Sequence, residues 1–245
     1  MSPRPLLIKL TGAAVMVAAL AGCGSHGSQV AAARTYLDGP HTNSPLSAYS
    51  GLGGFAADPT GPHAEHGVWE VSAGQFFLCV PKPGTQVTIT KVVPHILRAA
   101  PPLAETTWMR AITRDQVRRT APKDRTDFEG VNSKGSPPDW KDPRRTFYAR
   151  GTWSKAVSGT RITTTCKQRM NADAAVTERR VPKAPIVHEL VITLRVGPAG
   201  GSVHGFDIHF TSDGRPGILK VTWDISACGT AWALRALGCT RSEHS

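Results

Sequence analysis

IVHELVITLRVGPAGGSVHGFDIHFTSDGRPGILKVTWDIS, residues 186–226, is the stretch that decides the fold class. Apolar and polar residues alternate in three consecutive segments, 186–196, 203–211 and 218–225. Successive side chains of a strand point to opposite faces, so each segment predicts a strand with one buried face. The residues expected on these buried faces are Leu190, Ile192, Leu194, Val196, Phe206, Ile208, Phe210, Leu219, Val221, Trp223 and Ile225. Glycine-containing turns separate the segments, which predicts an antiparallel meander.

Further strands are expected upstream of this stretch. Residues 68–71 and 75–80 are apolar enough for strands joined by a turn at 72–74, and residues 86–93 alternate cleanly. Three strands so close in the sequence predict hairpins. The 24 glycines and 19 prolines argue against long helices. We therefore expect a mostly β, antiparallel, sandwich-like single domain with little helix.

A polar stretch, residues 113–145, interrupts the strand pattern. It contains nine basic and six acidic residues and few apolar ones. We expect a short helix around 114–120 followed by a long irregular loop, a kind of loop that is often functional. Trp140, with Arg144 and Arg145 behind it, is the candidate for binding a partner. The alternative is that Trp140 pins its own loop to the domain surface.

The N-terminus has the order of features of an export signal. Arg4 and Lys9 precede an apolar run, residues 10–20, that is too short to span a bilayer and has the length of a signal-peptide core. The run ends in Leu20-Ala21-Gly22-Cys23, and with this tetrapeptide the segment resembles a bacterial lipoprotein signal. The resemblance covers only residues 1–23, and it implies diacylation of the Cys23 thiol and cleavage just before it.

This resemblance divides the chain into three parts. Residues 1–22 would be the signal peptide, and residues 23–67 would be the lipidated cysteine and a flexible tether, rich at first in glycine and serine. Residues 68–245 would be the β-rich extracytoplasmic domain. The expected location is the extracytoplasmic face of the bacterial cell membrane, which the protein would contact through its lipid.

Four cysteines remain after Cys23, and an even number in an oxidising compartment predicts disulfides. Four cysteines allow three pairings. We favour a short bridge, Cys228–Cys239, and a long one, Cys79–Cys166, because the first two lie close together in the sequence. No C-x-x-C spacing occurs, so the cysteines do not indicate a redox motif or a zinc site.

The exported chain is expected to be basic. Removal of residues 1–22 takes away two of the 29 basic residues and no acidic one, which leaves 27 against 18 and a net charge of about +9. Such a charge favours anionic lipid head groups, anionic envelope polymers or another envelope protein as partners, and export argues against nucleic acid. The alternative is that the charge is spread over the surface and only keeps the protein soluble.

Motifs that would identify an enzyme are missing from the sequence. It contains no G-x-S-x-G, no H-E-x-x-H and no P-loop, so we predict no catalytic residue, no cofactor and no metal site. The function expected is a lipid-anchored cell-envelope protein that acts as a binding module for an unknown ligand. The alternatives are an extracytoplasmic hydrolase whose site is assembled from distant residues, and a structural accessory subunit of an envelope complex.

Overall fold

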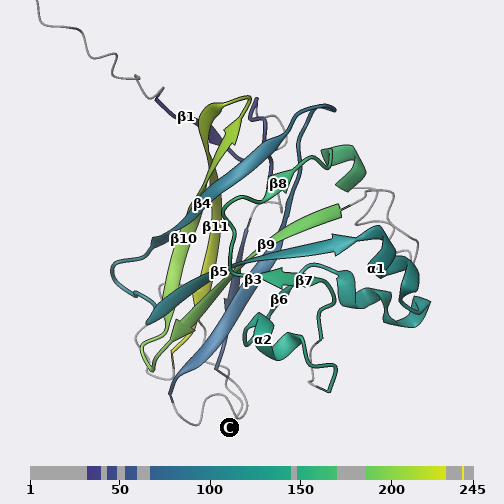
Figure 1. Ribbon diagram of the computed structural model, residues 1–245. Helices are drawn as coiled ribbons and strands as arrows, with labels where there is room; N and C mark the ends of the chain where they lie inside the picture. The colour runs from purple at the N-terminus through teal and green to yellow at the C-terminus, as the bar shows by residue number, and fades with distance from the viewer. Residues whose placement is uncertain are drawn as a thin grey trace, which may run out of the picture. The chain divides into compact units, whose positions relative to one another are not determined.

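Two β-sheets pack as a sandwich in the computed structural model (Figure 1). The structure describes residues 32–39, 43–48, 53–59, 67–144, 148–169, 186–229 and 239. The predicted fold class, mostly β and antiparallel with little helix, is confirmed. None of the helices in the described part of the chain has the length and apolar character needed to cross a membrane.

The first sheet has the strand order β1-β11-β10-β4-β8, with β2 also paired to β11. Its strands are β1 (Arg34–Leu37), β2 (Gly54–Ala57), β4 (Val87–Ile96), β8 (Arg161–Ile162), β10 (Gly201–Ser212) and β11 (Arg215–Ala227). The second sheet has the order β6-β3-β9-β5-β7. Its strands are β3 (Trp69–Leu78), β5 (Ala104–Thr113), β6 (Asn132–Lys134), β7 (Thr152–Ser154) and β9 (Ile186–Val196).

Both sheets contribute to one apolar core, and all eleven residues predicted to point inward belong to it. The Phe76 ring of β3 meets two rings of the opposite sheet edge-on, with centroids 4.8 Å from Phe206 and 5.1 Å from Trp223. Burial of one such aromatic side chain stabilises the fold by about 2 kcal/mol. The alternation in the sequence therefore identified the inward faces correctly.

The predicted strand partners were wrong in two places. β10 and β11 form a hairpin, but β9 lies in the other sheet, between β3 and β5, so the three segments are not a meander. Residues 69–78 form one strand rather than two joined by a turn, with a bulge between Ala73 and Phe76. β3 and β4 also belong to different sheets and form no hairpin. Alternation reveals which face is buried, but it does not identify the neighbouring strand.

The expected tether, residues 23–67, contains part of the folded domain. β1 and β2 both pair in parallel with β11, and Leu46 between them is fully buried in the core. The boundary predicted at residue 68 is therefore wrong, and the described sheet already begins at Arg34. The signal was missed because a four-residue edge strand shows too few alternations to be distinguished from a loop.

Both predicted disulfides are present. Cys79 and Cys166 are bridged with a Cα–Cα distance of 4.8 Å, and Cys228 and Cys239 with 5.7 Å. Disulfides persist in oxidising compartments, so the pair indicates an extracytoplasmic environment. The helical turn predicted at 231–237 lies outside the described residues.

Candidate functional site

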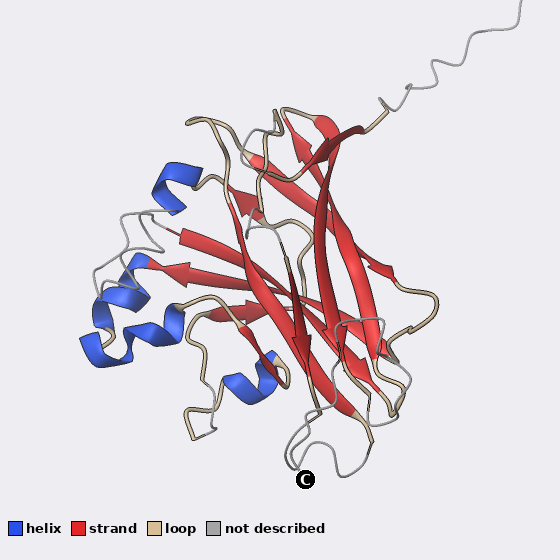
Figure 2. Ribbon diagram, turned by 180° about the vertical axis from the view of Figure 1, so that it is seen from behind, coloured by secondary structure: helices blue, strands red, loops and turns tan. Residues whose placement is uncertain are grey.

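Residues 113–154, called the insertion below, fold over the outer face of the second sheet (Figure 2). They contain α1 (Arg114–Arg119), the 3₁₀ helix η2 (Pro122–Phe128), β6, α2 (Pro137–Trp140) and β7. The predicted helix at 114–120 is confirmed as α1, but the prediction of a long irregular loop after it is wrong, because that segment contains η2, β6 and α2. Because residues 113–145 contain few apolar residues, the sequence indicated a loop. Those apolar residues nevertheless pack in the interior: Val117, Phe128, Val131 and Trp140 are all buried.

A capping box fixes the start of α1. The Gln116 backbone N–H donates to Thr113 Oγ1, and the Thr113 N–H donates back to Gln116 Oε1 over 2.7 Å. At the other end the Thr120 hydroxyl donates to the Gln116 carbonyl over 2.9 Å. The sequence T-R-D-Q at 113–116 therefore ends β5 and turns the chain directly into the insertion.

Trp140 is buried with 2% of its surface exposed, which overturns its prediction as an exposed partner-binding residue. Its ring lies against Trp153 with centroids 5.9 Å apart, and its Nε1–H donates to the Lys134 carbonyl. The alternative interpretation, that Trp140 pins its own loop, matches these contacts. Arg144 is exposed and paired with Asp142 over 2.9 Å, and this hydrogen bond raises the pKa of Arg144; Arg145 lies outside the described residues.

A fully buried ion pair lies between the insertion and the sheet. Arg110 of β5 and Glu189 of β9 are both 0% exposed, and Nη1 of Arg110 donates to Glu189 Oε2 over 2.8 Å. Burial lowers the pKa of Arg110, and the charge of Glu189 opposes that effect. The sequence placed Glu189 on the polar face of its strand; it is on that face, but the insertion covers it.

Backbone groups of the insertion and of β3 satisfy the rest of this pair. Glu189 Oε1 accepts the N–H groups of Gln75 over 2.7 Å and Val131 over 2.8 Å. Arg110 donates to three backbone carbonyls, those of Asp127, Glu129 and Arg150. Four of these five backbone bonds hold the insertion to the sheet, at residues 127–131 and at Arg150, and the fifth is to Gln75 of β3. Gln75 takes a positive φ of 65° at the β3 bulge, the place where its N–H meets Glu189.

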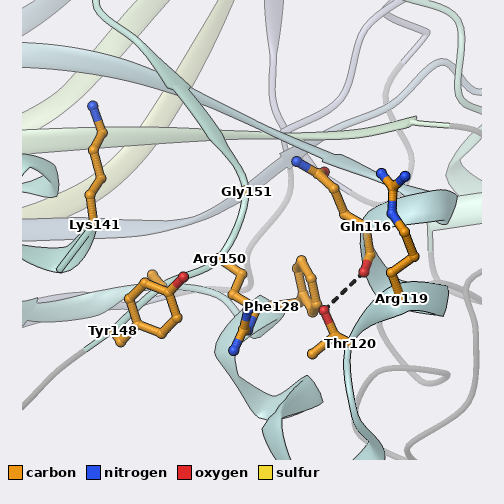
Figure 3. Close-up of a pocket in the computed structure, with 9 residues that line it drawn as sticks. Gln116, Arg119, Thr120, Phe128, Lys141, Tyr148, Arg150 and Gly151 are labelled. Atoms are coloured by element: carbon orange, nitrogen blue, oxygen red, sulfur yellow. Dashed lines mark hydrogen bonds between the residues drawn. The ribbon is translucent and has the colours of Figure 1, made fainter. Parts of the chain in front are cut away.

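An open pocket of about 360 Å³ lies on the solvent side of the insertion (Figure 3). α1 supplies one wall, and the segment that leads into β7 supplies the other. The described residues that line the pocket are Gln116, Arg119, Thr120, Phe128, Lys141, Tyr148, Ala149, Arg150 and Gly151. Three of these nine are cations, and the nine include no acidic residue and no histidine.

The three cations are held differently. Arg150 is fixed, because its Nε donates to Asp127 Oδ2 over 2.9 Å and its guanidinium lies 5.0 Å from the Tyr148 ring centroid. Lys141 and Arg119 are exposed and stand on opposite sides of the pocket in Figure 3. The Lys141 ammonium lies 5.7 Å from the Trp108 ring centroid. A small anion in this pocket would find two adaptable positive charges beside hydroxyl, amide and phenol groups.

Histidines on the first sheet form pairs rather than a cluster. His204 Nδ1 lies 2.9 Å from Asp224, and His95 Nε2 lies 3.2 Å from Asp207, both on the outer polar face. Among the described residues no group of three His, Cys, Asp or Glu is placed to hold a metal ion. His188 of β9 is mostly buried, and burial lowers its pKa to about 4.

Comparison with protein-family models, with curated proteins and with solved structures finds no match. The pocket is therefore the feature on which a function can be built. The region singled out from the sequence, residues 113–145, contributes part of the pocket, but the sequence did not indicate the pocket residues Arg119, Tyr148 and Arg150. The available signal was the excess of basic over acidic residues in that region; the fold was needed to show which of them share a surface.

Proposed function

We propose that this protein is a lipid-anchored extracytoplasmic binding module whose basic pocket takes a small anionic group, of the kind carried by phosphate-bearing envelope polymers. The observation that carries the proposal is the pocket in the insertion, where three cations line an open cavity and no carboxylate opposes them among the described lining residues. The cell membrane is the second partner, reached through diacylated Cys23.

The composition of the pocket favours binding over hydrolysis. Its one aliphatic hydroxyl, that of Thr120, donates to a backbone carbonyl, and the described lining supplies no histidine or carboxylate as a general base. Arginine and lysine are the side chains that recognise phosphate, by bidentate hydrogen bonds and by point charge respectively. The structure fits the predicted binding module better than the alternative of a hydrolase.

The anion-binding part is tested by titration calorimetry with glycerol 3-phosphate at low salt. We expect the double variant Arg119→Gln with Lys141→Gln to bind at least ten-fold more weakly than the parent. The matched control is Arg118→Gln with Lys123→Gln, which removes the same charge from exposed neighbours on α1 and η2 that do not line the pocket. Equal loss in both variants, or no binding by the parent, refutes the assignment of the pocket.

The anchor is tested on cells that express the parent and Cys23→Ser. Two acyl chains give stable membrane attachment that high salt does not reverse, whereas electrostatic attachment weakens with salt. We expect the parent to incorporate labelled palmitate and to stay membrane-bound after a high-salt wash. We expect no label on Cys23→Ser. Labelling of the variant equal to that of the parent would exclude Cys23 as the lipidated residue.

A further inference from the structure

One end of the first sheet gathers exposed basic residues from four separate segments. They are Arg34 at the start of β1, Lys82 in the turn before β4, Arg161 in β8 and Arg215 at the start of β11, and together they are called the basic end below. In the same short segments the acidic residue is Asp213, in the turn between β10 and β11. The basic end therefore has a net charge of about +3.

Strand register places Arg34, Arg161 and Arg215 at the same edge, and Lys82 lies in the turn that precedes β4 there. Arg34 is opposite Gly217, two residues from Arg215, and Arg215 is opposite Ser212. Ser212 is opposite Val87 at the start of β4, and Thr88, the next residue of β4, is opposite Arg161. Figure 1 shows the start of β1 beside the turn that joins β10 to β11. Cations far apart in the sequence thus share one end of the sheet.

The chain also enters the domain at this end. β1 runs parallel to β11, so its first residue, Arg34, lies where β11 begins. Ten residues, 24–33, separate Arg34 from Cys23. Ten residues span at most about 35 Å when fully extended. A lipid on Cys23 would therefore keep the basic end within that distance of the bilayer.

We infer that the basic end docks on the anionic surface of the membrane that holds the lipid anchor. The inference rests on the lipidation of Cys23 proposed above. A tether this short makes docking an intramolecular event with an effective concentration in the millimolar range, so weak charge attraction is sufficient. Each basic residue near an anionic bilayer strengthens binding by about five-fold. Docking there leaves the pocket on the insertion, a separate surface, available to its ligand.

The test uses a chain that begins at Gly24, which lacks the lipidated cysteine. This chain retains the whole described fold, because every described strand, helix and disulfide lies between residues 32 and 239. Binding is measured by co-sedimentation with two kinds of vesicle. One contains phosphatidylcholine alone, and the other also contains about 30% of the anionic lipid phosphatidylglycerol. We expect binding to the anionic vesicles only, decreasing as salt is raised.

The decisive variant is Arg34→Gln with Arg161→Gln and Arg215→Gln. We expect its binding to anionic vesicles to fall on the order of 100-fold. The control, Arg98→Gln with Arg114→Gln and Arg195→Gln, has the same net charge, and its changed residues are exposed and lie outside the basic end. We expect a change of less than five-fold in the control. Equal binding of both triple variants overturns the inference, as does equal binding of the parent to both vesicle types. Failure of lipidation would appear instead as unlabelled parent protein in cells.

Discussion

The buried ion pair gives the sharpest stability prediction, the substitution Glu189→Gln. Glutamine keeps the shape of the side chain, and its carbonyl oxygen can still accept the N–H groups of Gln75 and Val131. Its NH₂ group would then face the Arg110 guanidinium, a donor against a donor. The positive charge of Arg110 would remain fully buried without a counter-charge.

The expected loss follows from that geometry. Removal of one partner of a buried ion pair costs about 3–5 kcal/mol, because the other charge stays desolvated and uncompensated. Apolar replacement of both partners often restores stability in other proteins. Here it should not, because Arg110→Met with Glu189→Leu would leave two backbone N–H groups and three carbonyls without partners. At about 1 kcal/mol for each group, the double variant should lose about 5 kcal/mol.

Urea denaturation at 25 °C under oxidising conditions measures these free energies of unfolding. The control is Glu105→Gln, the same substitution at an exposed position of β5, with an expected change within about 0.5 kcal/mol. A loss below about 1 kcal/mol in Glu189→Gln would refute the reasoning. Full recovery of stability in the double variant would show that neither the ion pair nor its backbone bonds are needed to hold the insertion.

Two further predictions concern stability. The pKa of His188 is about 4 in the folded state and 6.5 in the reference state, so the unfolded chain binds a proton first as the pH falls. The contribution of His188 to stability should therefore be complete above pH 6.5. The free energy of unfolding should decrease by up to about 3 kcal/mol as the pH falls to 4. Urea midpoints at pH 7 and 4.5 should show this decrease in the parent and a smaller one in His188→Leu, and identical decreases would contradict it. Removal of the Cys79–Cys166 bridge, which joins residues 87 apart in the sequence, should cost about 4–5 kcal/mol of stability. Removal of the Cys228–Cys239 bridge, with a separation of 11, should cost about 3 kcal/mol. Thermal melting of the two double alanine variants measures both losses.

The fold was predictable from the sequence as far as the inward faces of the long strands. Phe206, Ile208 and Phe210 follow a period of two, and burial of one face requires that period. Their partners were not predictable, because β9 pairs with β3 and β5 from distant parts of the chain. The pairing depends on which apolar faces fit together in space, and alternation carries no information about that choice.

Of the candidate site, the sequence indicated a region but not the residues that form it. Glu189 alternates with Val191 and Thr193 against the core residues of β9, a pattern that normally indicates a solvent-facing strand surface. What covers that face is an insertion that begins about 75 residues upstream, in a segment whose few apolar residues are spaced too irregularly to predict packing. Val131 and Trp140 complete that cover, and neither has a local pattern that predicts its burial.

The ion pair and the pocket are parts of one arrangement. Arg110 donates to the carbonyls of Arg150 and Asp127, and the Asp127 carboxylate in turn binds the Arg150 side chain that lines the pocket. The buried pair therefore fixes the backbone of Arg150 directly. It also holds Asp127, which fixes the Arg150 side chain. An apolar contact in place of this pair would leave these carbonyls without donors and would not orient them. The costly buried charge beneath the basic pocket thus fixes the backbone that carries Arg150, whereas Arg119 and Lys141, the exposed cations of the pocket, are not held by this pair.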